Sequence, residues 1–149
     1  MINNLTSAIV PSDVFGWEVN TDVGYGRETF TLTLGTGEVA RVGTVMEVDY
    51  EAKTATVVDG ATLTDAAAVK ALGDLVVFVG RDIKTVATNL VADETGKVVG
   101  ITRGDGRGTL YKKYLDFKGT SFETLDAAVR TALTAKFTTE NRFKVLDAV

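Results

Sequence analysis

The chain has 149 residues, 45% of them hydrophobic and 24% charged, with a formal net charge of −4, which is the composition of one globular domain. It contains no histidine and no cysteine, which excludes thiol nucleophiles, disulfides, iron–sulfur clusters, ordinary zinc sites and any catalytic triad with an imidazole base. No apolar stretch approaches the roughly 18 residues of a membrane helix, and no basic segment precedes an apolar one at the N-terminus, so we expect no membrane partner and no signal peptide.

Residues 1–26 are predicted to form an N-terminal arm on a single β-rich domain, residues 27–149. They hold the only proline and the only tryptophan of the chain, and no basic residue. Their apolar residues follow neither a helical nor a strict strand period. Such a segment is either a strap over the core or an arm that docks on a partner. We favour the arm, because Trp and Phe dominate interface energetics.

The rest of the chain has mostly strand patterns. Residues 29–34 alternate polar and apolar side chains, which predicts a half-buried strand. The continuous apolar run 75–79 predicts a strand that is buried on both faces. A turn is expected at residues 93–96, between strands at 86–91 and 98–102. Further strands are predicted at 39–48, 53–58 and 143–146.

Two helices interrupt these strands. Residues 64–73 have a capping residue at the start, alanines inside and a glycine at the end. Residues 120–123 fit the capping box T-x-x-E and predict a helix that begins there, with Phe122, Leu125, Val129 and Leu133 on one face. The predicted fold is therefore α+β and mainly β, with a small, mixed, barrel-like β core, two short helices and the extended N-terminal arm.

Two motifs are candidate sites for chemistry. Glu47, Asp49 and Glu51 alternate along a predicted strand and could share a face as cation ligands or as an acid/base pair. We favour a solvated strand face, and expect no enzyme activity, no metal and no cofactor. The glycine-rich segment 103–108 lacks the following helix of a phosphate-binding loop. We expect an exposed turn there, with a partner-contact loop as the alternative.

Basic residues gather late in the chain, around Tyr111 and Tyr114. Residues 1–75 carry four basic and eleven acidic side chains, net −7, whereas residues 76–149 carry twelve basic and nine acidic ones, net +3. Aromatic residues interleaved with cations can bind nucleic acid, but an acidic protein with a pI near 4.8 and so short a patch argues against it. We expect no nucleic acid, and instead contact with the acidic surface of another subunit or of a capsid. The residues expected to make it are Arg103, Arg107, Lys112 and Lys113.

The order of the motifs resembles a known family of viral structural proteins. An N-terminal arm is followed by Val42-Gly43-Thr44-Val45-Met46, by Asp59-Gly60-Ala61 before an alanine-rich stretch, by the buried strand 76–79, by Leu115-x-Phe117 before an alanine-rich helix, and by Lys144-Val145-Leu146. Over about residues 39–149 this pattern resembles the head decoration, or cement, proteins of tailed bacteriophages, the lambda-type decoration family.

The resemblance implies a function in the virion. Members of this family form trimers on the outer surface of the expanded capsid and clamp adjacent capsomers, often with the N-terminal arm adding to strands of the capsid protein. The implied partners are the major capsid protein and further copies of the chain, as a homotrimer that assembles in the host cytoplasm. The chain is longer than the compact members of the family, and a dimer is the alternative.

The expected capsid contacts lie in the arm, at Ile9, Val10, Phe15 and Trp17, with Tyr25 at its junction. Deletion of residues 1–20 is expected to abolish capsid binding and leave the fold intact. The alternative function is a small-ligand or carbohydrate-binding β domain of a phage fibre or tail, with Trp17, Tyr25, Tyr111 and Tyr114 stacking on a sugar. A carboxylate-based hydrolase around Glu47, Asp49 and Glu51 ranks third.

Overall fold

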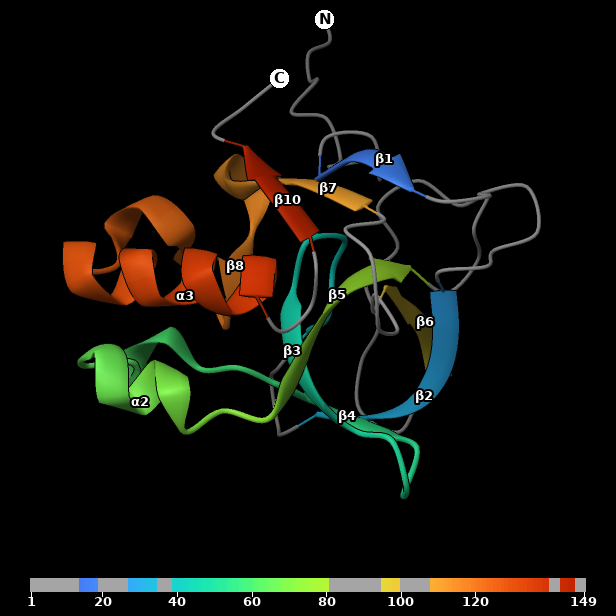
Figure 1. The fold of residues 1–149 in the computed structure, drawn as a ribbon. Helices are drawn as coiled ribbons and strands as arrows, with labels where there is room; N and C mark the ends of the chain where they lie inside the picture. Colours follow the sequence, from blue (N-terminus) through green and yellow to red (C-terminus); the bar gives the residue numbers. More distant parts are fainter. Residues whose placement is uncertain are drawn as a thin grey trace, which may run out of the picture.

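The computed structural model describes residues 14–18, 27–34, 39–80, 95–99, 108–139 and 143–146. The strands are β1 (Phe15–Glu18), β2 (Arg27–Thr33), β3 (Val45–Asp49), β4 (Thr54–Val57), β5 (Asp74–Gly80), β6 (Thr95–Val99), β7 (Gly108–Tyr111), β8 (Asp116–Phe117), β9 (Thr120–Ser121) and β10 (Phe143–Leu146). The helices are α2 (Ala66–Lys70), α3 (Ala127–Thr139) and the short 3-10 helices η2 (Gly60–Thr62), η3 (Lys112–Tyr114) and η4 (Phe122–Thr124). The predicted class, α+β and mainly β, is confirmed (Figure 1).

Five strands form a small closed barrel. Their order is β2-β4-β3-β5-β6, and β6 pairs back onto β2. The β2–β4 pair is parallel, and the other pairs are antiparallel. Alternate side chains point inward, as the period of a strand requires, so Phe30 and Leu32 of β2 are buried as predicted. The barrel interior is filled by Phe30, Leu32, Ala40, Met46, Val48, Ala55, Val76, Phe78 and Val98.

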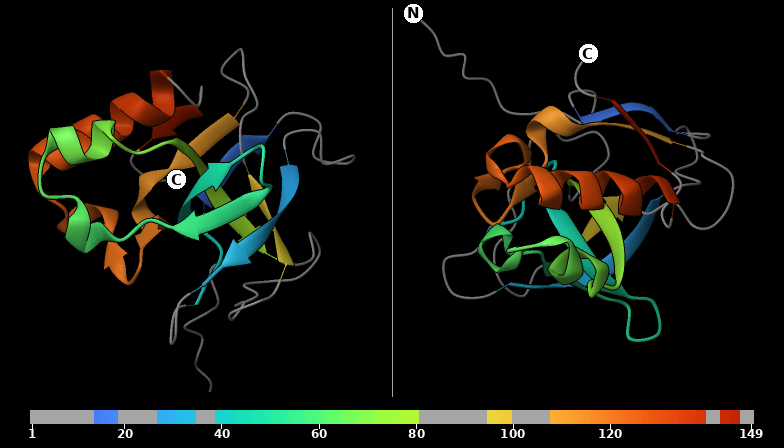
Figure 2. Two further views of the ribbon diagram at one scale, coloured as in Figure 1. Left: turned by 90° about the horizontal axis from the view of Figure 1, so that it is seen from below. Right: turned by 60° about the vertical axis from the view of Figure 1, so that its left-hand side comes forward.

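A second apolar core lies outside the barrel, and β5 contributes to both cores. Val76 and Phe78 belong to the barrel core, whereas Leu75, Val77 and Val79 belong to the second core. All five side chains are fully buried, which confirms the prediction for residues 75–79. The second core is covered by α3, which contributes Val129, Leu133 and Phe137. Figure 2 shows α3 and α2 side by side against the barrel.

A three-stranded sheet, in the order β1-β7-β10, lies beside the barrel (Figure 1). Its central strand β7 is antiparallel to β1 and parallel to β10. Val14 and Phe15 are buried in the second core, at 0% and 6% exposure. Residues 14–18 are therefore the intramolecular strap that the sequence left as an alternative, and Phe15 is a core residue. The remaining residues of the predicted arm, 1–13 and 19–26, lie outside the described residues.

The two helices begin and end differently from the predictions. Helix α2 is only five residues long, and the Asp65 side chain caps it by accepting a hydrogen bond from Ala68 N at 2.8 Å. The capping-box prediction at residue 120 was wrong. Thr120 and Ser121 pair with β8, the chain is extended at Leu125, and α3 begins only at Ala127. Hairpin pairing thus overrides the local cap. No helix of the described ranges is long and apolar enough to cross a membrane.

Two strand boundaries also differ. Thr95 and Gly96, predicted in a turn, belong to β6, because they pair with Thr31 and Phe30 of β2. The strand predicted from residue 39 begins only at Val45, since Gly43 has a left-handed φ of +98°. The strands predicted at 53–58 and 143–146 are confirmed as β4 and β10. The strand predicted at 86–91 lies outside the described residues.

Candidate interaction surfaces

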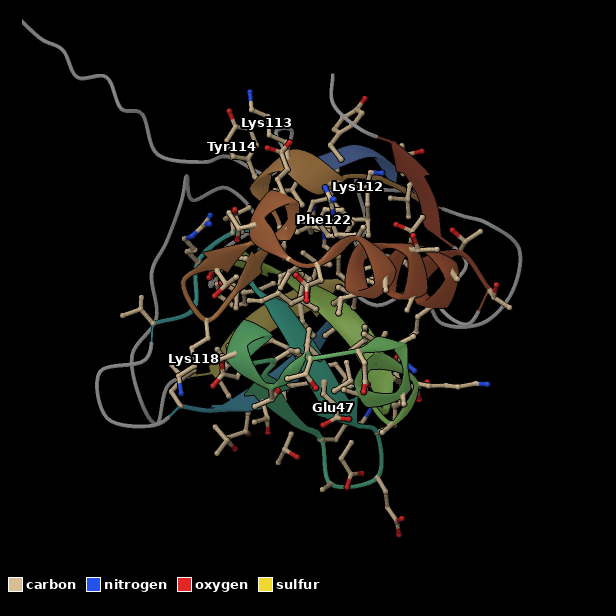
Figure 3. All side chains as sticks on the ribbon, turned by 90° about the vertical axis from the view of Figure 1, so that its left-hand side faces the viewer. Glu47, Lys112, Lys113, Tyr114, Lys118 and Phe122 are labelled. Carbon is tan, nitrogen blue, oxygen red and sulfur yellow. The ribbon has the colours of Figure 1, made fainter. Side chains whose placement is uncertain are left out.

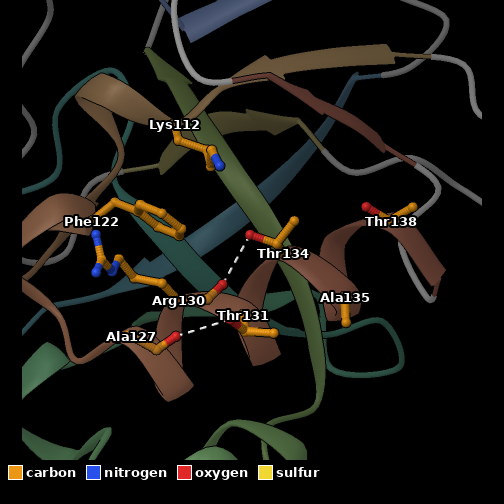
Figure 4. A pocket seen from close by; sticks show the side chains of 8 residues that line it. All are labelled: Lys112, Phe122, Ala127, Arg130, Thr131, Thr134, Ala135 and Thr138. Carbon is orange, nitrogen blue, oxygen red and sulfur yellow. Dashed lines mark hydrogen bonds between the residues drawn. The ribbon is translucent and has the colours of Figure 1, made fainter.

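An open groove of about 590 Å³ runs along one face of α3, beside η3 and η4 (Figure 4). Its lining consists of three threonines, two alanines, one phenylalanine and two cations: Lys112, Phe122, Ala127, Arg130, Thr131, Thr134, Ala135 and Thr138. Among the residues that the structure describes, no acidic side chain lines it, and Glu123 and Asp126, which are close by in the sequence, are exposed. We call this surface the cationic groove.

The wall of the cationic groove is made by η3 and η4. Phe122 is buried, and Lys112 Nζ lies 5.5 Å from the centre of its ring, within the range of a cation–π contact. The two segments are joined through Leu115, whose N donates to Lys112 O at 3.2 Å and whose O accepts from Phe122 N at 3.3 Å. This wall is therefore held in place by the backbone of the β8–β9 region.

Apart from Arg130, the α3 side of the cationic groove is made of alanine and threonine side chains. Thr131 Oγ1 donates to Ala127 O at 3.0 Å, and Thr134 Oγ1 donates to Arg130 O at 2.9 Å (Figure 4). These two hydroxyl protons are used within the helix, and Lys112 and Arg130 are the charged groups among the described lining residues. The groove suits a partner that is apolar in part and carries an anion.

Arg130 has an unsatisfied polar atom. Its Nε is buried and has no hydrogen-bond partner among the described residues. Leaving a buried donor of a charged group unpaired costs free energy, of the order of a few kcal/mol.

The predicted contact residues lie at different places. Lys112 lines the cationic groove, and Lys113 is exposed with its Nζ 5.3 Å from the ring centre of Tyr114. Arg103 and Arg107, and with them the loop 103–108, lie outside the described residues. The sequence pattern predicts Phe122 on the buried face of a helix and does not single out Arg130. The signal that could have indicated this surface is the alanine and threonine stripe along α3.

The predicted arm enters the domain at a sheet edge. Trp17 occupies a position in β1 opposite Thr109 of β7. Within the described ranges, no strand pairs with the other side of β1. The remaining predicted arm contacts, Ile9, Val10 and Tyr25, lie outside the described residues. Tyr111 and Tyr114, which were expected to stack on a sugar in the alternative function, are both half-buried. Tyr114 packs against the second core.

The carboxylates of the predicted acidic stripe have structural contacts. The Glu47 carboxylate accepts a hydrogen bond from Gly73 N, across from β3 to the end of α2. Asp49 Oδ1 accepts from Glu51 N and from Ala52 N, each at 2.9 Å, and so braces the β3–β4 turn. Glu51 lies in that turn and beyond the strand, so the three carboxylates do not share one strand face. Among the residues that the structure describes, no cluster of acidic side chains could hold a metal ion.

Comparison of the chain with protein-family models, with curated proteins and with solved structures found no match.

Proposed function

We propose that the chain is a capsid decoration protein, which binds the outer surface of the expanded head of a tailed bacteriophage and clamps adjacent capsomers. The observation that carries the proposal is the position of β1. This strand joins the N-terminal segment to the domain, and its outer edge has no partner strand among the described residues. An open strand edge offers backbone donors and acceptors to a further strand from another protein.

The anchoring of β1 suits a clamp. Val14 and Phe15 are buried in the second core, directly after the apolar and basic-free residues 1–13. A load on the N-terminal residues would therefore be transferred to the core of the domain. Each copy would bind modestly, and several linked contacts would gain affinity through effective concentration.

Two further observations support association instead of catalysis. The chain has no histidine or cysteine, and Glu47 and Asp49 are engaged in structural hydrogen bonds. The cationic groove and the exposed Lys113 offer further contacts to an acidic protein surface.

The test is co-sedimentation with expanded capsids of the phage that carries this sequence, prepared without their decoration protein. The truncation must end before β1, because deletion of residues 1–20 would also remove Val14 and Phe15 from the core. We expect a chain that lacks residues 1–12 to lose capsid binding and to keep its thermal unfolding midpoint.

A matched pair of variants gives the control. Ile9→Ser with Val10→Ser should weaken co-sedimentation, whereas Asn3→Ser with Asn4→Ser should leave it unchanged. Full capsid binding by the chain without residues 1–12 would contradict the proposed role of the arm. Absence of binding by the intact chain would contradict the proposed function itself.

A further inference from the structure

The N-terminal segment is attached to the domain beside η3. Because β1 and β7 are antiparallel, with Phe15 opposite Leu110, β1 begins next to the end of β7 from which η3 continues. Val14 and the backbone of Tyr114 also lie against the same residue, since a Cβ at Gly43 would meet both the Val14 side chain and the Tyr114 carbonyl. The attachment point of residues 1–13 is therefore adjacent to η3.

The surface of η3 at this point is positively charged. Lys113 is exposed, with its Nζ 5.3 Å from the centre of the Tyr114 ring, a contact that leaves the charge of the ammonium in place. No acidic residue occurs in the sequence from Gly108 to Leu115. An exposed cation at the edge of an interface favours a partner of opposite charge. The attachment point of residues 1–13 thus has an exposed positive charge beside it.

The turn that joins β3 to β4, residues 50–53, lies at the other end of the molecule. Figure 1 shows this turn extending from the end of the barrel that is remote from β1. In Figure 3, Lys113 and Tyr114 lie on one side of α3, whereas Glu47 of β3 lies on the other. A surface that contacts β1 and η3 together would therefore leave the β3–β4 turn uncovered.

The β3–β4 turn has no net charge of its own and a fixed conformation. It carries one glutamate and one lysine, Glu51 and Lys53, which are both exposed. Its backbone is held by the Asp49 carboxylate, which accepts hydrogen bonds from Glu51 N and Ala52 N, each at 2.9 Å. Ala52 is also exposed. Its side chain is therefore a suitable position for a probe at this end of the molecule.

We propose that the domain docks with β1 and η3 facing the capsid and with the β3–β4 turn facing away from it. The Lys113 ammonium then pairs with a carboxylate of the capsid protein, close to the strand that adds to β1. The inference rests on the proposed function and adds to it the orientation of the domain and the charge of the partner surface. Because β1 and η3 lie side by side, one capsid surface engages both, and the two contacts reinforce each other.

The test uses the absence of cysteine from the chain. A single cysteine is introduced at an exposed position, as Lys113→Cys or Ala52→Cys, and is labelled with a maleimide-linked polyethylene glycol before capsids without decoration protein are added. Labelled Lys113→Cys should lose about tenfold or more in co-sedimentation relative to its unlabelled form, because the polymer separates two surfaces that must come into close contact. Labelled and unlabelled Ala52→Cys should bind like the intact chain.

A pair of charge reversals tests the chemistry of the partner. Lys113→Glu should raise the dissociation constant by about threefold or more at low salt, the size expected of an exposed ion pair, and less at high salt. Lys70→Glu, at an exposed position of α2, should leave it unchanged. All variants should keep the thermal unfolding midpoint of the intact chain.

The outcomes distinguish the orientation from the proposed function. Full binding by labelled Lys113→Cys, or loss of binding when Ala52→Cys is labelled, would overturn the orientation and leave the proposed function standing. Equal dissociation constants for Lys113→Glu and Lys70→Glu would overturn the pairing with a carboxylate. Absence of binding by the intact, unlabelled chain would contradict the proposed function, and the orientation with it.

Discussion

Lys136 Nζ donates a hydrogen bond to Leu72 O at 2.8 Å and thereby joins α3 to the residue that follows α2. Lys136 is only 5% exposed. On the other side of the same connection, Gly73 N donates to the Glu47 carboxylate of β3. The segment between α2 and β5 is therefore attached to both α3 and the barrel, and these two bonds orient the helix that carries the cationic groove.

Replacement of Lys136 by alanine should destabilise the protein. The variant leaves Leu72 O without its donor and removes the packing of the aliphatic stem, so we expect a loss of about 1–3 kcal/mol in the free energy of unfolding. Urea denaturation measures this loss. Lys70→Ala, at an exposed position of α2, is the control and should change the stability by about 0.5 kcal/mol or less. Equal effects of the two substitutions would contradict the role of Lys136.

Gly43 is the point where the barrel backbone comes closest to η3. Its φ is +98°, and a Cβ at this position would lie 2.4 Å from Tyr114 O. The left-handed conformation alone costs a non-glycine residue of the order of 1–3 kcal/mol, and the clash adds to it. Gly43→Ala should therefore lower the unfolding midpoint strongly and disturb the wall of the cationic groove.

Gly119 provides a matched control for that substitution. Its φ is +85°, but a Cβ there would meet no atom within 4 Å. Gly119→Ala should cost only the conformational part, of the order of 1–3 kcal/mol, without the clash. If thermal unfolding gave equal losses for the two variants, the close approach of Gly43 to Tyr114 would be refuted.

Phe15 should behave as a core residue, although the sequence placed it among the arm contacts. Its side chain is 6% exposed in the second core, so Phe15→Ala should reduce the free energy of unfolding by about 3 kcal/mol. Deletion of residues 1–12 should leave that free energy unchanged. Denaturant titration of both variants decides between strap and arm at this position, and a stable Phe15→Ala variant would contradict the strap.

Asp116 is a buried carboxylate at the junction of the barrel and the β8–β9 hairpin. It lies 3.4 Å from Arg41 Nη2 and accepts a hydrogen bond from Gly119 N at 3.2 Å. Asp116→Ala should destabilise the protein by about 1–3 kcal/mol, because the Gly119 N–H and the partly buried Arg41 guanidinium then lose their acceptor. Asp74→Ala, at an exposed position, is the control. Chemical denaturation should show a clear loss of stability for Asp116→Ala and only a small one for Asp74→Ala. Equal losses would contradict the role of Asp116.

Local patterns in the sequence determined much of the fold. The polar–apolar alternation of β2 and the continuous apolar run of β5 depend on which faces of a strand are buried, and both predictions are confirmed. The mainly β class followed from such patterns. The predicted turn at Thr95 and Gly96 and the capping box at Thr120 were wrong, because pairing with a distant or neighbouring strand outweighed the local preference.

The sequence by itself determined the absence of histidine and cysteine chemistry, the division of charge and the strands with a clear period. Only the tertiary structure decided that β1 pairs with β7 and that β2 pairs in parallel with β4 in the barrel. It also decided that Phe122 and Arg130 line one groove with Lys112. The physical reason is that these relationships depend on backbone pairing and side-chain packing between segments far apart in the chain, which no local period encodes.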